Sequence, residues 1–241
     1  MHAYRGTLCV LLLIGLSLPL AGDDADRSKS AQKEALAKFN GLIGGWRGTG
    51  QPRRGSNSGA WQEKAEWVWV LKDDVVALDY VVTEGKLLKS ARLAHDPKSG
   101  IYTLTAKIDD DIERTYAGKL DEQKLVLTSQ ADSKADEVYR ITITQLNELR
   151  TLVLYEKRKP DITNFSRVAE VGYTRAGRRL AKEGGGQPVC VVTGGLGTIE
   201  VQHKGKTYYV CCTGCQQAFE DDPEGILADY AARIAKEKTK P

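Results

Sequence analysis

A chain of 241 residues is long enough for one large domain, or for a medium domain and a small one. Its hydrophobic content of 41% and its charged content of 28% are ordinary for a globular protein. The formal net charge of +3 is too small to indicate binding to nucleic acid, and the sequence has no stripe of Lys and Arg with interleaved aromatic residues. We therefore predict no nucleic-acid partner.

The N-terminal segment, residues 1–22, has the pattern of a secretory signal peptide. A short start with Arg5 is followed by an apolar run from Leu8 to Leu20, and then by small residues and acids. The run of about 13 residues is shorter than the ~20 needed to span a bilayer; an uncleaved anchor is the alternative. We predict an exported protein, periplasmic or extracellular, with no membrane span once the signal and its Cys9 are removed.

The next segment has the spacing of a short helix. Ser30 is a candidate N-cap. Apolar residues recur at helical spacing at Ala35, Leu36, Phe39 and Leu42. The helix is expected to end at the glycines Gly41, Gly44 and Gly45. We expect it to pack over the mouth or the end of a sheet.

Residues 46–174 alternate with a period of two, the pattern of strands that have one buried face. In "IYTLTAKI", Tyr102, Leu104 and Ala106 share a face that opposes the threonines. Turn-like segments such as "KDD", "TEGK" and "HDPKSG" separate about eight to ten such strands. An antiparallel meander of this size removes its open edges most completely by closing. We therefore predict a mainly β fold, with an antiparallel up-and-down barrel over residues 30–176.

A second, smaller module follows the predicted barrel. Residues 177–187 contain three successive glycines and no sheet periodicity, so we predict a flexible linker. Over residues 188–238 we predict a small α+β module, with a β-hairpin around "HKGK" followed by helices. The last helix begins with Asp222 as N-cap and Pro223 as its first residue. A module of about 50 residues needs a metal or a disulfide to support its small core.

The cysteines of the predicted mature chain all lie in this module, at Cys190, Cys211, Cys212 and Cys215. Three of them stand where the second strand of the hairpin meets a helix. Backbone N–H groups and the helix dipole at such a position favour thiolate over thiol. Thiolates that converge from this point and from the earlier loop would form a soft metal site, which selects Cu(I) or Zn(II) over magnesium or calcium.

Ten residues of this module match a known pattern: Pro188, Val189, Cys190, Gly205, Lys206, Tyr208, Cys211, Cys215, Phe219 and Pro223. On these residues the segment 188–230, about a fifth of the chain, resembles the YHS/TRASH family of metal-binding modules. The resemblance implies metal binding through Cys190, Cys211 and Cys215. Cys212 stands where the family often has Ser, and could be a fourth ligand. Val191 and the residue after it replace a Gly-Met of the family, so a thioether ligand is missing.

Three other interpretations of the module remain open. Four cysteines in an oxidising compartment are an even number and could form two disulfides, one of them between Cys190 and a later cysteine. Cys212 and Cys215 form a C-x-x-C and could act in thiol–disulfide exchange, although the usual βαβ context is absent. His203, in the expected turn, could be a further metal ligand.

Two short segments, "GLIGGWRGTG" and "HDPKSGIY", resemble parts of the lipocalin-like, or calycin, barrels of secreted bacterial proteins. The resemblance implies a barrel whose interior could hold an apolar small molecule. The candidate ligand-binding residues are Trp46, Trp67, Trp69 and Tyr102, which could equally fill the core. A related haem-binding barrel needs a histidine late in the barrel, and "RVAEVGYTRAG" has none, so we predict no haem.

The sequence contains no nucleophile elbow, phosphate-binding glycine loop or H-E-x-x-H pattern, so we predict a binding protein rather than an enzyme. We expect it to capture or sense a soft metal ion through its C-terminal thiolates, with a barrel that holds a ligand or a partner. One alternative is a carrier of an apolar small molecule whose C-terminal module is stapled by disulfides. A more distant one is a thiol–disulfide oxidoreductase.

Overall fold

The computed structural model describes residues 21–72, 74–108, 112–129, 137–176 and 188–238. The predicted linker lies outside the described residues, and so does the predicted signal peptide except for its last two residues, which begin the first helix. No helix in the part of the chain that the structure describes is long and apolar enough to cross a membrane.

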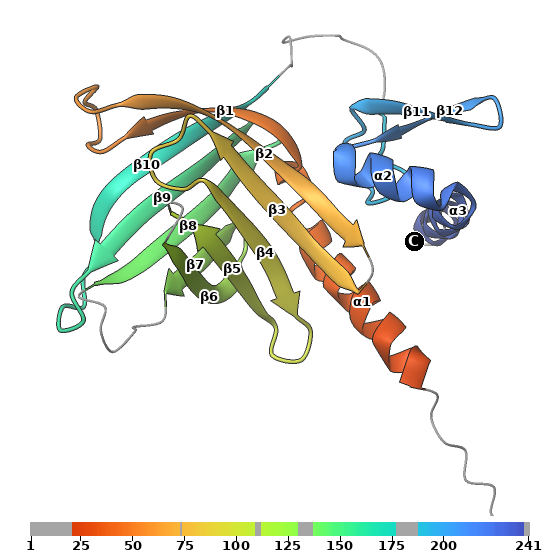
Figure 1. The fold of residues 1–241 in the computed structure, drawn as a ribbon, viewed down its shortest axis with the longest axis horizontal. Helices are drawn as coiled ribbons and strands as arrows, with labels where there is room; N and C mark the ends of the chain where they lie inside the picture. Colours follow the sequence, from red (N-terminus) through yellow and green to blue (C-terminus); the bar gives the residue numbers. More distant parts are fainter. Residues whose placement is uncertain (1–20, 73, 109–111, 130–136, 177–187, 239–241) are drawn as a thin grey trace, which may run out of the picture.

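Ten antiparallel strands form a closed barrel, in which each strand pairs with its neighbours in sequence and β1 closes on β10 (Figure 1). The strands are β1 (Gly44–Gln51), β2 (Trp61–Lys72), β3 (Val75–Thr83), β4 (Ser90–Asp96), β5 (Ile101–Lys107), β6 (Glu113–Asp121), β7 (Lys124–Ser129), β8 (Val138–Asn147), β9 (Arg150–Arg158) and β10 (Ser166–Arg175). The mainly β fold and the closed antiparallel barrel that the period-two pattern predicted are confirmed.

The alternation of apolar residues decides which side chains fill the barrel. In β5, Tyr102, Leu104 and Ala106 are buried, while the residues between them are partly exposed. In β8, Ile141 and Ile143 follow the same alternation. Each fully buried aliphatic side chain contributes about 1.5–3 kcal/mol relative to an exposed one. This interior layer supports the barrel without any cysteine.

One end of the barrel is covered by helix α1 (Ala21–Ala37) and the short 3-10 helix η1 (Asn40–Leu42). α1 contacts β3 and β4, and η1 contacts β8. The Tyr102 hydroxyl donates to the carbonyl oxygen of Ala35 at 3.1 Å, and the Phe39 ring meets the Tyr102 ring edge-on, with centroids 5.3 Å apart. The expectation that the first helix packs over an end of the sheet is confirmed.

The limits of α1 differ from those expected. The helix begins at Ala21 and Ser30 lies inside it, so the prediction that Ser30 is its N-cap is wrong. Strong helix formers stand on both sides of Ser30, and Asp24 near the N-terminus interacts favourably with the helix dipole. The helix ends at Ala37 rather than at the glycines, because the chain then tightens into η1.

The C-terminal module consists of a hairpin and two helices, as predicted. β11 (Ile199–His203) pairs with β12 (Lys206–Val210), and α2 (Thr213–Asp221) and α3 (Pro223–Lys238) follow. The two turn residues have positive φ angles, 49° at Lys204 and 75° at Gly205, a combination typical of tight hairpin turns. α2 contacts β2, so the module lies against the barrel wall (Figure 1).

Gly118 in β6 tests how tightly the barrel wall is packed. A Cβ at this position would overlap the carbonyl oxygen of Val126 in β7, so we expect Gly118→Ala to lower the free energy of unfolding by about 1–3 kcal/mol. Gly172→Ala in β10 is the matched control, because its Cβ would meet Leu152 at 3.7 Å, an ordinary contact. Denaturant unfolding followed by tryptophan fluorescence measures both, and equal midpoints would contradict this packing.

Candidate metal centre

Two separate chain segments bring three cysteines together. Cys190 lies in the loop before β11, Cys211 follows β12 directly, and Cys215 lies in the first turn of α2. The loop is fixed to the hairpin because the N–H of Val191 donates to the carbonyl oxygen of Tyr209 at 3.0 Å. The hairpin therefore positions both parts of the site.

The sulfur atoms of Cys190, Cys211 and Cys215 lie within 4.8 Å of one another. The Cys211 and Cys215 sulfurs are 3.5 Å apart, whereas a disulfide bond is ~2.05 Å long, so these two are not bonded to each other. Thiolates around a tetrahedral zinc ion lie ~2.3 Å from the metal and hence roughly 3.8 Å apart. The three sulfurs are thus close enough together to hold a soft metal ion.

The three sulfurs are buried and can hydrogen-bond to one another. Cys190 and Cys215 are 0% exposed and Cys211 is 3% exposed. The pKa of Cys190 is lowered, because Cys211 and Cys215 can donate S–H bonds to its sulfur, although burial opposes this. The pKa values of Cys211 and Cys215 are raised, first by their bonds to Cys190 and further by burial. Burial disfavours charge on all three sulfurs, so a bound cation would be needed to stabilise three thiolates together.

A helix N-terminus and an arginine lie close to the segments that carry these cysteines. Cys215 lies near the N-terminus of α2, where the helix dipole favours an anion. Arg233 of α3 donates to the carbonyl oxygens of residues 190–192 at 3.0–3.4 Å. A guanidinium group therefore lies beside the loop that carries Cys190.

Cys212 lies beside the group of three sulfurs but not within it. It is 1% exposed, and its sulfur accepts a hydrogen bond from the backbone N–H of Trp69 in β2 at 3.4 Å. Its pKa is lowered by S–H bonds from Cys211 and Cys215, to which the Trp69 N–H adds. The Cys212 sulfur is not within 4.8 Å of all three others. That Cys212 is a fourth ligand therefore stays a prediction.

The uncovered edge of β2 explains why Cys212 meets the barrel here. β1 pairs with β2 only as far as Trp67, whereas β3 pairs with it further along. The backbone groups of β2 after Trp67 therefore have no described strand on the β1 side. The start of α2 covers this edge: Cys212 accepts the Trp69 N–H, and Gly214 lies so close to the Trp69 carbonyl oxygen that a Cβ would overlap it.

The barrel also contacts the loop that carries Cys190. The Trp69 indole N–H donates to Asn40 Oδ1 at 3.2 Å, and the Asn40 amide donates to the carbonyl oxygen of Thr193 at 2.7 Å. The Thr193 hydroxyl in turn lies 3.4 Å from the Cys211 sulfur. A continuous line of hydrogen bonds thus joins the barrel wall to the cysteine group.

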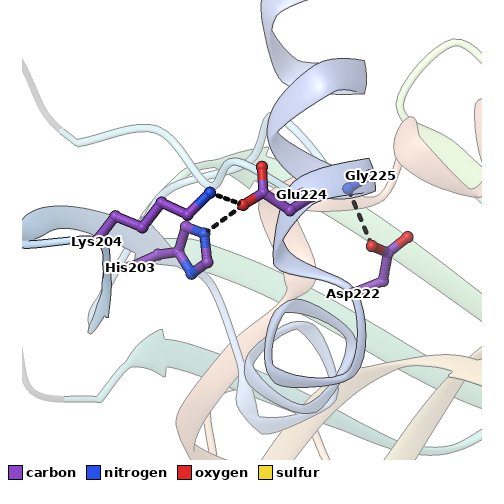
Figure 2. Close-up of polar contacts among 5 residues, drawn as sticks. All are labelled: His203, Lys204, Asp222, Glu224 and Gly225. Atoms are coloured by element: carbon purple, nitrogen blue, oxygen red, sulfur yellow. Dashed lines mark hydrogen bonds and ion pairs between the residues drawn. The ribbon is translucent and has the colours of Figure 1, made fainter.

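His203 is not part of the sulfur group. Its Nε2 lies 3.0 Å from Glu224 Oε1, and Lys204 bonds to the same oxygen (Figure 2). Asp222 accepts the Gly225 N–H at 3.0 Å, as expected of the N-cap of the last helix (Figure 2). These contacts fasten the hairpin turn to the first turn of α3.

The four aromatic residues predicted to bind a ligand are Trp46, Trp67, Trp69 and Tyr102, and all four are buried. The Trp46 indole donates to the carbonyl oxygen of Leu42 at 2.6 Å, and the Trp67 ring stacks on the Tyr80 ring with centroids 4.6 Å apart. The space between Trp46, Trp67 and their neighbours has no volume for a water molecule. Side chains fill this part of the barrel, and a bound apolar molecule stays a prediction.

The barrel interior contains a buried polar group that was not predicted from the sequence. Glu63 of β2 is buried, and it accepts hydrogen bonds from the Trp61 indole at 2.5 Å and from the Tyr173 hydroxyl. The Tyr173 hydroxyl also bonds to that of Tyr80, and burial raises the pKa of both phenols. The signal was present in the sequence, because Glu63 has the same parity along β2 as the buried Ala65.

Neither a protein-family model nor a curated protein sequence matches the chain.

Asn40 joins the barrel to the cysteine loop, and its removal tests that connection. Asn40→Ala leaves the Trp69 indole and the Thr193 carbonyl without this partner, so we expect the free energy of unfolding to fall by about 1–3 kcal/mol. Asn57→Ala, at an exposed position between β1 and β2, is the control. Denaturant unfolding measures both, and an unchanged midpoint for Asn40→Ala would refute the connection.

Glu224 makes the module sensitive to acid. Its pKa is lowered by its bonds to Lys204 and then His203. A carboxylate with a lowered pKa in the folded state stabilises the fold above its ordinary pKa, and this contribution is lost as the pH falls through the lowered value. The wild type should therefore unfold at a higher denaturant concentration than Glu224→Gln near pH 7, and this difference should disappear as the pH falls through the lowered pKa of Glu224.

Unfolding midpoints measured across that pH range check this expectation. Glu220→Gln, which removes an exposed acidic charge from α2, is the control. A difference between wild type and Glu224→Gln that stays constant with pH would mean that the ion pairs of Glu224 do not stabilise the fold.

Proposed function

We propose that this protein captures or senses a soft metal ion through the thiolates of Cys190, Cys211 and Cys215. The observation that carries the proposal is the convergence of three sulfurs, from segments about twenty residues apart in sequence, within 4.8 Å of one another in a buried space. Free thiols gathered in this way without a cation would repel one another once ionised.

The donor set indicates the kind of ion. Thiolate sulfur is a soft ligand and prefers Cu(I), Zn(II) and heavier thiophilic ions to hard cations. Binding displaces the thiol protons, and because the unfolded chain has no such site, the binding free energy also stabilises the module. The resemblance of residues 188–230 to the YHS/TRASH family supports the same chemistry.

Burial of the sulfurs favours binding over turnover. Thiol–disulfide exchange needs a thiolate that a substrate can reach. Cys212 and Cys215 of the C-x-x-C motif are 1% and 0% exposed. The same burial would protect the thiols from oxidation if the protein is exported, as its N-terminal sequence predicts.

A carrier function for the barrel receives less support. The space between Trp46, Trp67 and their neighbours has no volume for water, and the four described cysteines are free rather than paired in a staple. We propose instead that the barrel serves as a rigid support for the cysteine module, through α2 and the Asn40 contacts.

The test is titration of the reduced protein, without oxygen, with Cu(I) and with Zn(II), followed by native mass spectrometry. We expect a single bound ion per chain. Cys190→Ser and Cys215→Ser should each weaken binding by more than about 100-fold, because removal of a residue that only supports a ligand already costs about 10–100-fold. His203→Ala, in the same module but outside the sulfur group, is the control and should bind as the wild type does.

Two results would count against the proposal. Thiol counting that shows two disulfides, with no ion in the protein as purified and none bound after reduction, would favour the stapled carrier. Insulin-reducing activity that is lost in Cys212→Ser would favour the thiol–disulfide enzyme.

A further inference from the structure

The structure contains a fourth buried sulfur that the barrel holds next to the proposed site. Cys212 follows Cys211 directly, yet its sulfur lies outside the group formed by Cys190, Cys211 and Cys215. It contacts Cys211 and Cys215, whose S–H groups can donate to it, and it also accepts the Trp69 N–H at 3.4 Å.

The position of Cys212 depends on the docking of α2 to β2. The Trp69 N–H belongs to the stretch of β2 that β1 does not cover, and a buried backbone donor needs an acceptor. Gly214 sits on the carbonyl oxygen of the same residue, where no larger residue fits. The two contacts hold the start of α2 in one place, and the Cys212 sulfur with it.

The number of available ligands distinguishes the ions. Structural zinc sites are almost always tetrahedral, with four protein ligands. The three sulfurs here are 0–3% exposed, so solvent has little access to supply a fourth ligand. Cu(I) is softer than zinc and is satisfied by three sulfur ligands.

We propose that the barrel sets the coordination number of the site: strand β2 holds the Cys212 sulfur aside, so that the docked protein presents three thiolates and selects Cu(I) over Zn(II). This inference rests on the proposed function and assigns its ion. Undocking of α2 would free Cys212 to join the other three sulfurs, and the site would then offer zinc its four ligands.

Gly214→Ala is the variant that undocks the module. Its Cβ would overlap the Trp69 carbonyl oxygen, while alanine suits the helix itself better than glycine does. Gln217→Ala, on the exposed face of the same helix, is the matched control. The double variant Gly214→Ala/Cys212→Ser then shows whether any change depends on the fourth sulfur.

The experiment measures Cu(I) and Zn(II) affinities of the reduced full-length protein by competition with chelators, and counts sulfur neighbours by X-ray absorption. We expect three sulfurs around Cu(I) in the wild type, and Cu(I) affinity unchanged in Cys212→Ser. Zinc affinity should rise by about tenfold or more in Gly214→Ala and fall back in the double variant, and Gln217→Ala should match the wild type.

The possible outcomes separate this inference from the proposed function. If neither ion binds the reduced wild type, the proposed function fails and this inference fails with it. If an ion binds with four sulfurs, or if Cys212→Ser weakens Cu(I) binding tenfold, the proposed function stands and only this inference is overturned. The wild type and Cys212→Ser decide this even if Gly214→Ala does not fold.

Discussion

The stretch of β2 that extends past β1 is the constraint on which the C-terminal site depends. An antiparallel barrel closes fully only where its strands overlap, and beyond Trp67 the β1 side of β2 has no strand partner among the residues that the structure describes. Leaving a buried backbone group without a hydrogen bond costs about 1–3 kcal/mol. The start of α2 covers this edge with the Cys212 sulfur and the backbone of Gly214. Because the same turn of helix carries Cys215, the contact that completes the barrel wall also orients the proposed metal ligand.

The second constraint is electrostatic. Three sulfurs that share a buried space cannot all ionise on their own, since each thiolate raises the free energy of the next. The N-terminus of α2 favours a negative charge on Cys215, but it does not balance three charges. A bound cation would balance these charges. Metal binding and folding of the module would then be coupled, so that each favours the other. A module of this size, with a small core of its own, gains from such an arrangement.

Much of this architecture could be predicted from the sequence, because local patterns determine it. The period of two along residues 46–174 marks the strands, and the resemblance of residues 188–230 to a metal-binding family implies that Cys190, Cys211 and Cys215 meet. Long-range contacts explain the rest. The bond between Trp69 and Cys212 joins residues 143 positions apart, and no local pattern predicts it. Ser30 was expected to begin a helix because its residue type favours N-caps, but the helix formers before it override that preference.

The buried carboxylate of Glu63 determines the direction of two hydrogen bonds inside the barrel. A phenol hydroxyl can donate one hydrogen bond, and that of Tyr173 donates to Glu63. Tyr80, which is bonded to the same Tyr173 oxygen, must therefore be the donor of that bond. A single acidic side chain on β2 thus determines how the hydroxyl groups on β3 and β10 are oriented. This hydrogen-bond network favours one arrangement of the interior side chains of these strands over other arrangements of the same side chains.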